Sequence, residues 1–263
     1  IIPSTPEMIA EYLAETAETY AVATLQRRLA AISKAHRAIG ADDPCLSEIV
    51  QAVMRGVSRS RGVAQRQAQA LLRDELFAVL DRLEDRPKDI RDRALLLLGW
   101  ATAVRRSELV ALDVEDVEFT TKGALVTVRR SKTDQEGRGR EIAVPLGRTR
   151  HCPIAALKEW LAFAEIETGA IFTTVNKHGH LLKSRMSGEA ASNVVKARVA
   201  DAGYDPAAFS GHSLRAGFVT AAALAGASTH KIRETTGHRS ESGLAPYLRT
   251  INLFDDAAVA RLL

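Results

Sequence analysis

The sequence predicts a mainly α-helical fold with a small antiparallel β-sheet, arranged as two domains. Apolar residues recur at helical spacing through most of the chain. One pair of segments instead alternates apolar and polar residues around a polar turn that contains glycine, which is typical of a β-hairpin. The length of 263 residues lies between one and two domains of roughly 150 residues. Apolar residues make up 46% and charged residues 26%, a globular composition that excludes a disordered or collagen-like chain.

The first domain is expected over residues 1–62 and consists of helices. Thr5 can cap the first helix, and a helical pattern of apolar residues ends at Gly40. A further helix is expected over residues 47 to about 58, followed by a linker over residues 63–67. Because short helices bury little surface, this domain is a small satellite or the remainder of a larger one.

The second domain is expected over residues 68–263. It begins with an apolar helix face and continues with a long apolar helix that ends near Ala103. A hairpin follows, with strands over residues 124–128 and 141–146. After this hairpin the pattern returns to helices. These are expected around residues 153–166, 187–202, 213–225, 229–235, 241–248 and 255–263.

The basic residues are clustered, although the net charge is a mild +4. Such clusters favour phosphate backbones because neutralising the phosphates releases counterions. A solvated linker and a solvated hairpin are the alternative interpretation. The two clusters consist of Arg55, Arg59, Arg61, Arg66 and Arg73, and of Arg129, Arg130, Lys132, Arg138 and Arg140.

The location of the protein can also be inferred from the sequence. No stretch approaches the roughly 20 consecutive apolar residues of a membrane span. With two cysteines and no signal-peptide pattern, we expect a soluble protein of the reducing cytoplasm. Because the sequence begins at Ile1 and not at methionine, we expect a part of a longer gene product. The pair His178 and His180 lacks carboxylates or cysteines at ligand spacing, so we expect a loop there and no metal.

Short motifs follow the predicted elements in order. An arginine and a glutamate three residues later follow the long apolar helix, and a lysine lies in the hairpin turn. A Gly-His-x-x-Arg string begins a later helix, and a Gly-His pair shortly precedes a tyrosine. The residues are Arg105, Glu108, Lys132, His212, Arg215, His238 and Tyr247. Each motif alone is weak, but their combination in this order is a strong signal.

In this combination the sequence resembles the tyrosine recombinase, or phage integrase, family. The family pattern is Arg-x-x-Glu-Leu, a hairpin lysine, His-x-x-Arg, Gly-His or Gly-Trp, and a tyrosine. The resemblance covers essentially the whole chain. It implies an integrase-type catalytic domain over residues 68–263. Over residues 1–62 it implies part of a helical DNA-binding domain whose first helices have no counterpart before Ile1.

The resemblance implies a site-specific recombinase that cleaves and rejoins DNA through a 3′-phosphotyrosyl intermediate and a Holliday junction. Four copies would act on double-stranded DNA with an inverted-repeat target site, joined by a C-terminal helix at about residues 255–263. No metal or other cofactor is implied. The protein would then be associated with the nucleoid. Type IB topoisomerase activity and a catalytically silent DNA-binding role stay open, as does the choice between integration, excision and resolution.

The chemistry explains why these residue types are required. Planar guanidinium groups, here Arg105 and Arg215, can bind the phosphate oxygens that gain charge in the transition state. Tyr247 would be the nucleophile, and its phenol must lose a proton as it attacks. The resemblance makes Lys132 the donor of a proton to the leaving 5′ oxygen.

The remaining catalytic candidates have less definite roles. His212 and His238 can donate to a phosphate oxygen or accept a proton, and the sequence leaves open which histidine is the base. Glu108 is expected to position the site. The family commonly has glycine where this chain has Ala103, and alanine is acceptable there if its φ is negative.

DNA contacts outside the catalytic site are expected on two helical regions. By resemblance, the helix at about residues 187–202 enters the major groove, and a basic helix that also carries His36 does so from the opposite side. An ordinary amphipathic helix is the alternative. The candidate contacts are Arg27, Arg28, Lys34, Arg37, Arg59, Arg61, Lys183 and Arg185.

Overall fold

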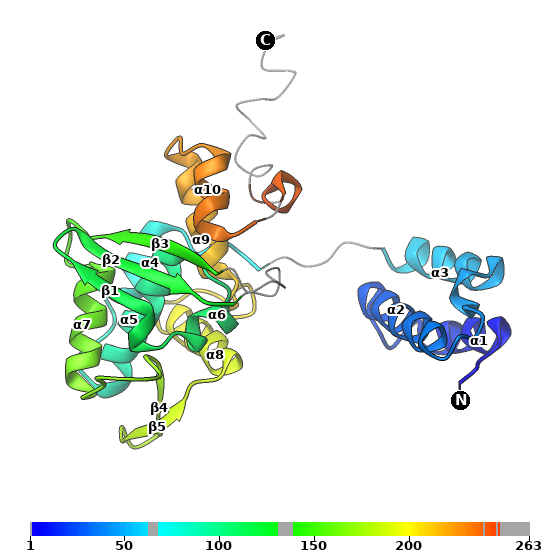
Figure 1. Cartoon of the computed structure of the whole chain (residues 1–263), viewed down its shortest axis with the longest axis horizontal. Coiled ribbons are helices and arrows are strands. Elements are labelled where there is room, and N and C mark those ends of the chain that lie inside the picture. Colours follow the sequence, from blue (N-terminus) through cyan, green and yellow to red (C-terminus); the bar gives the residue numbers. More distant parts are fainter. Residues whose placement is uncertain (1, 63–67, 131–138, 239, 246, 248–263) are drawn as a thin grey trace, which may run out of the picture. The chain divides into compact units, whose positions relative to one another are not determined.

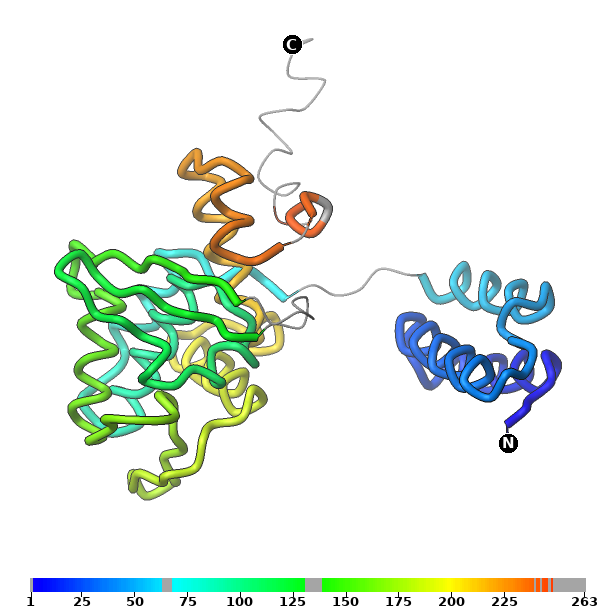
Figure 2. The backbone as a smooth tube through the Cα atoms, viewed as in Figure 1, coloured from blue at the N-terminus to red at the C-terminus, as the bar shows by residue number. Residues whose placement is uncertain are grey.

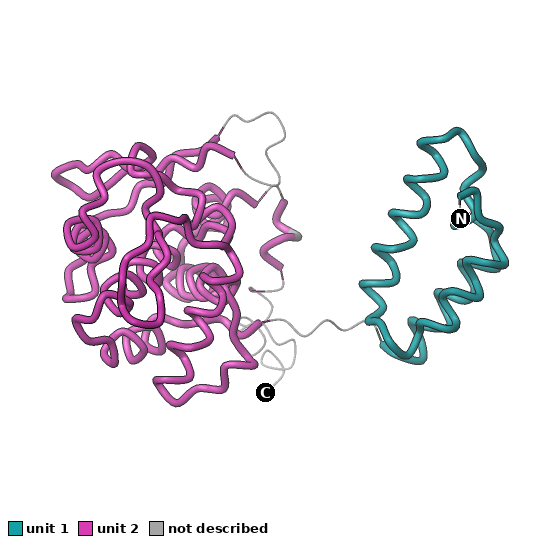
Figure 3. Tube along the Cα trace, turned by 90° about the horizontal axis from the view of Figure 1, so that it is seen from below, with its two compact units in different colours: residues 1–67 teal, residues 68–263 magenta. Residues whose placement is uncertain are grey.

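The computed structural model describes residues 2–62, 68–130, 139–238, 240–245 and 247 (Figure 1). The chain divides into two compact units, Ile1–Gln67 and Ala68–Leu263 (Figure 3). Helices predominate and short antiparallel strands form the rest of the regular structure, which confirms the predicted fold class. The expected C-terminal helix at about residues 255–263 lies outside the described residues. Within these described ranges, no helix is both long and apolar enough to cross a bilayer.

The first unit consists of three helices around a small core. Thr5 caps α1 as expected, because its hydroxyl accepts a hydrogen bond from the Met8 amide at 3.4 Å. Leu13, Leu25 and Val50 are fully buried between the helices. The elements are α1 (Pro6–Thr16), α2 (Val22–Ala38), the 3₁₀ turn η1 (Pro44–Leu46) and α3 (Glu48–Arg61).

His36 does not lie on a DNA-facing surface of α2, contrary to expectation. Its side chain is fully buried. The Nε2 atom accepts a hydrogen bond from the Ser4 amide at 2.8 Å, so Nδ1 carries the proton and donates to the Ile32 carbonyl at 2.9 Å. His36 therefore holds the N-terminal segment on α2.

The second unit surrounds the apolar helix α5, which is buried along most of its length. Helix α7 and strand β3 pack against it, as the ribbon and the backbone trace show (Figures 1 and 2). The helices are α4 (Arg73–Leu80), α5 (Pro87–Thr102), α6 (Arg106–Ala111), α7 (Pro153–Phe163), α8 (Gly188–Asp201), α9 (Ser213–Leu224) and α10 (Thr229–Thr236), with 3₁₀ turns η2 (Val114–Asp116) and η3 (Glu241–Gly243).

The predicted hairpin is present, but the β-structure is larger than expected. Strands β1, β2 and β3 form an antiparallel sheet in that order, and β4 and β5 form a separate ribbon. Only the first residue of β1 and none of β5 is buried, so neither strand shows the alternation that predicts one. Their bounds are β1 (Val117–Thr120), β2 (Gly123–Val128), β3 (Arg140–Pro145), β4 (Thr173–Val175) and β5 (Leu181–Arg185).

The segment at 241–248 begins with a short 3₁₀ turn, η3. Ala245 and Tyr247 are helical, as predicted for this stretch, and residues 246 and 248 lie outside the described residues. Leu244 follows the turn and is fully buried against Val219 and Ile232. This contact holds the segment that carries Tyr247 against α9 and α10.

A buried ionic cluster fixes α8 to α5. Arg198 of α8 lies 2.7 Å from Asp92 of α5 and also pairs with Asp89. Asp92 in turn pairs with Arg91 at 2.7 Å. Since these charges are buried, removing one partner would leave an uncompensated charge in the interior.

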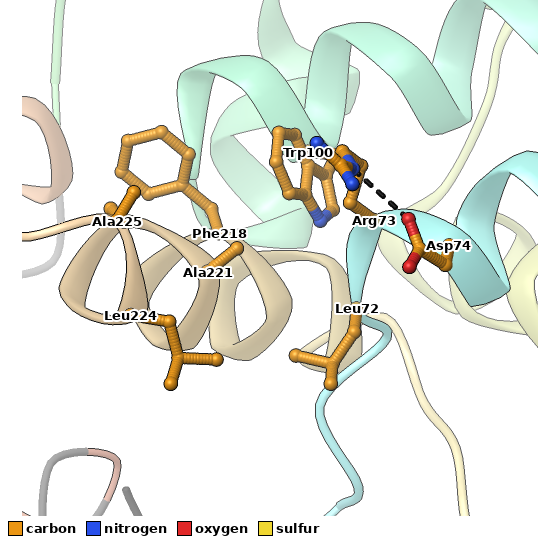
Figure 4. Close-up of a pocket in the computed structure, with 9 residues that line it drawn as sticks. Leu72, Arg73, Asp74, Trp100, Phe218, Ala221, Leu224 and Ala225 are labelled. Atoms are coloured by element: carbon orange, nitrogen blue, oxygen red, sulfur yellow. Dashed lines mark hydrogen bonds and ion pairs between the residues drawn. The ribbon is translucent and has the colours of Figure 1, made fainter.

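An apolar pocket lies on the same unit, between α4, α5 and α9 (Figure 4). Its volume is about 480 Å³. Trp100 and Phe218 meet edge to face at its floor, and Leu224, which is 61% exposed, stands at its rim. The pocket is therefore a lipophilic surface beside the helix that carries His212 and Arg215.

The residues before α4 lie directly on α9 at Gly217. The Leu71 amide donates to the Ser213 carbonyl at 3.0 Å, and the Trp100 indole donates to the Leu71 carbonyl at 3.0 Å. A Cβ atom on Gly217 would lie 1.8 Å from the Leu71 carbonyl oxygen. Only glycine allows the two backbones to approach so closely.

Gly217→Ala is therefore expected to destabilise the second unit by about 1–3 kcal/mol, because the helix and the Leu71 segment must separate. Urea unfolding followed by tryptophan fluorescence measures this loss, since Trp100 and Trp160 both lie in that unit. Gly56→Ala in α3 is the matched control. No atom lies within 4 Å of its added Cβ and it belongs to the first unit, so the unfolding midpoint reported by the tryptophans should equal that of wild type. Equal unfolding midpoints for wild type and Gly217→Ala would contradict the close approach.

Candidate active site

The second unit brings six of the seven candidate catalytic residues together. Arg105 and Glu108 stand at the start of α6, and His212 and Arg215 at the start of α9. His238 follows α10, and Tyr247 follows η3. The seventh candidate, Lys132, lies outside the described residues.

Glu108 holds Arg105 in place. The Arg105 Nη1 atom donates to Glu108 Oε1 at 2.7 Å, and the Arg105 amide donates to Oε2 at 3.1 Å. Burial alone would raise the pKa of Glu108, but the hydrogen bonds from Arg105 and the charge of Arg140 outweigh it and lower this pKa. The carboxylate is therefore ionised at neutral pH. It is suited to positioning Arg105 and not to donating a proton.

Ala103 adopts a left-handed backbone conformation, so the condition under which alanine would be acceptable there, a negative φ, is not met. Its φ is +50° and ψ is 26°, and its side chain is fully buried. An L-residue in this region carries roughly 1–2 kcal/mol of strain. The turn points the Ala103 carbonyl at Arg215, whose Nη1 donates to it at 2.7 Å. This alignment explains why the position commonly holds glycine.

Arg215 is almost completely buried, with 1% of its surface exposed. Its Nη1 atom also donates to the Thr236 carbonyl at 2.6 Å, so two backbone carbonyls support the guanidinium. Burial and the positive charge of Arg105 lower its pKa to about 10. Arg215 thus stays protonated at neutral pH and is fixed in position.

His238 is neutral and accepts a hydrogen bond from Arg215. The Thr236 hydroxyl donates its proton to the Ile232 carbonyl at 2.7 Å. The His238 Nδ1 atom lies 2.7 Å from the same hydroxyl oxygen, so Nδ1 carries a proton and donates it to that oxygen. The Nε2 atom is then free to accept from Arg215 Nη2 at 3.0 Å. Burial, followed by the charges of Arg215 and Arg105, lowers the pKa of His238 to about 4.

The Tyr247 hydroxyl is hydrogen-bonded to His212 Nε2. Burial together with the charges of Arg215 and Arg105 lowers the pKa of His212. Burial raises the pKa of Tyr247, and the charge of Arg215 opposes this effect. At neutral pH the pair therefore consists of a protonated phenol and a neutral imidazole that can accept its proton.

Arg140 is a residue of this site that the motifs did not single out. It begins β3, and its Nη2 donates to Glu108 Oε2 at 3.0 Å. The sequence placed it only within a basic cluster near the hairpin. Its position just after the glycine-containing turn was the available signal, but the pairing with Glu108 spans 32 residues and no local pattern reveals it.

The candidate DNA contacts are divided between the two units. The first-unit side chains lie on α2 and α3, where Arg28 stacks 3.7 Å from the centre of the Tyr20 ring. In the second unit, Lys183 and Arg185 lie on β5 and not in a loop before α8. Arg185 donates to the Val110 and Leu112 carbonyls at 2.9 and 3.2 Å and pairs with Asp113, so it ties β5 to the end of α6. The first-unit side chains are Arg27, Arg28, Lys34, Arg37, Arg59 and Arg61.

Comparisons with known proteins identify the family of the chain. The model of the phage integrase family matches residues 69–251. An integrase/recombinase xerD homolog from Selenomonas ruminantium is 36% identical over 266 residues, which cover 99% of this chain and 78% of that protein. The recombinase Cre of Escherichia phage P1 is 29% identical over 281 residues, covering 99% of this chain and 80% of that protein.

Solved structures share the fold at lower identity. XerH site-specific recombinase bound to a palindromic difH substrate has a TM-score of 0.63 at 17% identity, covering 97% of this chain and 73% of that one. A lambda integrase dimer bound to a COC′ core site has a TM-score of 0.65 at 19% identity, covering 93% and 64%. The chain therefore belongs to the phage integrase family and is a tyrosine recombinase, an enzyme that cleaves and rejoins DNA strands.

Proposed function

We propose that this tyrosine recombinase acts at a specific DNA site, with Tyr247 as its nucleophile and a 3′-phosphotyrosyl intermediate. The hydrogen bond between the Tyr247 hydroxyl and His212 carries the proposal. A phenol held by a neutral base beside the guanidinium groups of Arg105 and Arg215 is arranged to attack a phosphodiester.

In the proposed reaction, the Tyr247 oxygen attacks the phosphorus while His212 takes its proton. The bond from phosphorus to the 5′ oxygen breaks, and Lys132 gives a proton to that oxygen. Arg105 and Arg215 hold the non-bridging oxygens as negative charge develops on them. The new phosphotyrosyl bond conserves the energy of the broken one, so the reversal of these steps rejoins the strand without a cofactor.

We further propose that four copies exchange strands between two duplexes through a Holliday junction, at a target with inverted repeats. A lambda integrase tetramer bound to a Holliday junction shares the fold with a TM-score of 0.62 at 17% identity. The residues at about 255–263, which include Val259, Leu262 and Leu263, would join neighbouring copies. The apolar pocket rimmed by Leu224 is a surface of the catalytic unit that can receive such side chains.

Both units would contact the DNA, and the protein would be associated with the nucleoid. Exposed basic side chains on α2 and α3 supply charge from the first unit, and α8 is the proposed major-groove helix of the second. Arg185 would act by holding β5 in place, because its guanidinium is bonded within the protein.

Tyr247→Phe is expected to abolish covalent attachment to DNA, because no phenolic oxygen is left to attack. Wild-type protein mixed with the DNA fragments that flank its own gene should give a protease-sensitive shifted band on a denaturing gel. The band should persist in EDTA, since Arg105, Arg215 and Lys132 supply the charge that a metal would. A band of equal intensity from Tyr247→Phe would exclude this nucleophile.

Labelled versions of these fragments, made in two lengths, distinguish recombination from relaxation. Strand exchange between two duplexes should depend steeply on protein concentration, as a tetramer requires. Relaxation of a supercoiled plasmid at a rate proportional to protein, without exchanged strands, would instead indicate topoisomerase activity.

Lys132→Ala is expected to block cleavage of ordinary DNA but not of DNA in which sulfur replaces the leaving 5′ oxygen. A thiolate leaves without a proton because its conjugate acid has a lower pKa. Cleavage of both substrates is measured with matched wild-type reactions. Equal loss on both would show that Lys132 is not the proton donor.

The cleavage rate is expected to stay constant as the pH falls from 8 to 6.5 and to decline only below that. His212 must be neutral to accept the proton, and its lowered pKa keeps it neutral to a pH below its ordinary 6.5. The cleavage rate constant is measured from pH 5 to 9 at protein concentrations too low to saturate the DNA. Under this condition its pH dependence reports the pKa of the free enzyme. His212→Gln should be slower by about 10²- to 10⁴-fold and should lose this inflection. An inflection that persists in His212→Gln would assign it to another group.

A further inference from the structure

Arg140 lies where three separate parts of the active site meet. It begins β3, opposite Val128 in the register of β2 and β3. Its Nη2 atom donates to Glu108 Oε2 at 3.0 Å, while Arg105 donates to the other carboxylate oxygen at 2.7 Å. The Glu108 side chain is 4% exposed and that of Arg140 17% exposed, so the pair is largely shielded from water.

The guanidinium of Arg140 also lies flat against the backbone at Gly237. A Cβ on Gly237 would stand 2.9 Å from its Nη1 and 3.0 Å from its Cζ atom. Gly237 has a φ of +68° and ends α10. The glycine of the Gly-His motif thus leaves room for Arg140. The Arg140 side chain, at the start of β3, therefore lies against the residue that precedes His238.

The Arg140 Nε atom is buried and has no hydrogen-bond partner in the part of the chain that the structure describes. An arginine whose only task is to stabilise a fold normally satisfies its donors, because a buried donor without a partner costs about 1–3 kcal/mol. Arg129, on the neighbouring end of β2, differs. Its side chain is 55% exposed and pairs with both Asp113 and Asp116, at the two ends of η2.

The charges of the site are also unbalanced. Arg105, Arg140 and Arg215 face one another closely enough that the first two lower the pKa of the third. Among the described residues, Glu108 is the carboxylate that pairs with Arg105 and Arg140. Three positive charges around one negative charge favour the binding of an anion, and a DNA phosphate is the anion that this enzyme acts on.

We propose that Arg140 is a positioning residue of the recombinase site. It holds Glu108 Oε2, while the Arg105 guanidinium is bound to Oε1, and so keeps Arg105 aimed at the phosphate while adding positive charge beside His238. The proposal rests on the proposed function, in which Arg105 binds the scissile phosphate.

Arg140→Gln is expected to slow formation of the covalent DNA adduct by about 10- to 100-fold, since a small misplacement of a phosphate-binding group has effects of this size. Arg140→Lys, which keeps the charge but not the planar fork, should recover part of the rate. Arg129→Gln is the matched control. The sequence grouped Arg129 with the basic cluster at the hairpin, but its guanidinium is bound to Asp113 and Asp116 within the protein, so this variant should cleave at the wild-type rate. Tryptophan fluorescence melts confirm that each variant is folded.

The combination with Glu108→Gln tests whether Arg140 acts through Glu108. If it does, the cleavage rate of the double variant should lie within about threefold of the rate of Glu108→Gln alone. Independent, multiplying losses would overturn the positioning role. A rate for Arg140→Gln equal to that of Arg129→Gln would overturn it as well.

A second measurement does not need the DNA target or the nucleophile. Inorganic phosphate is titrated into the full chain, at constant ionic strength, and its binding is followed through the ring NMR signals of His212 and His238. The dissociation constant should rise about fivefold or more in Arg140→Gln and stay unchanged in Arg129→Gln. Equal affinity in all three proteins, or no binding by wild type, would overturn the proposal. Phosphate binding without any DNA adduct would instead count against the proposed function and leave this role intact.

The same spectra give the pKa of His238, which is held at about 4 in the wild type. The groups that face its ring are Arg215, Arg105, His212, Arg140, Thr236 and Tyr247. Loss of the Arg140 charge should raise this pKa in Arg140→Gln, and Arg140→Lys should restore most of the shift. An unchanged pKa in Arg140→Gln would contradict the placement of the charge beside His238.

Discussion

The active site depends on holding several guanidinium groups together in a place that water barely reaches. Such groups repel one another, and the repulsion is strong where the surroundings are apolar. The structure offsets it with one ionised carboxylate, Glu108, and with the carbonyls of Ala103 and Thr236. Each partner comes from a different element, so the site forms only when α6, α9 and α10 are all packed in place.

The scaffold explains how this packing is achieved. Helix α5 is buried along most of its length and ends in the left-handed turn at Ala103, which places Arg105 and the Ala103 carbonyl on the same side. Helix α9 packs against α5, and the segment before α4 approaches α9 closely enough to require Gly217. Arg105 and Arg215 are therefore attached directly to the buried core of the unit, which suits the preorganised charge that the proposed reaction needs.

Much of this could be predicted from the sequence, because local patterns carry it. Helical periodicity, the Thr5 cap and the hairpin were visible, and so were Arg105, Glu108, His212, Arg215, His238 and Tyr247 from the family motifs. What escaped prediction depends on contacts between distant parts of the chain. The φ of Ala103 goes with the hydrogen bond from Arg215 to its carbonyl. The place of Arg140 in the site depends on Glu108, which lies on another element. Strand β5 is defined by its pairing, since it buries none of its residues. The hydrogen bond between His212 and Tyr247, on which the proposal of His212 as the base rests, is likewise a contact that no local pattern reveals.

The neutral state of His238 bears on how the proposed site would receive a phosphate. In the free protein the ring lies beside Arg215 and its pKa is about 4, so at neutral pH it carries no proton on Nε2. A phosphate bound beside Arg215, as proposed, would bring a negative charge next to the ring and raise this pKa. DNA binding would then be linked to proton uptake at pH values near the raised pKa.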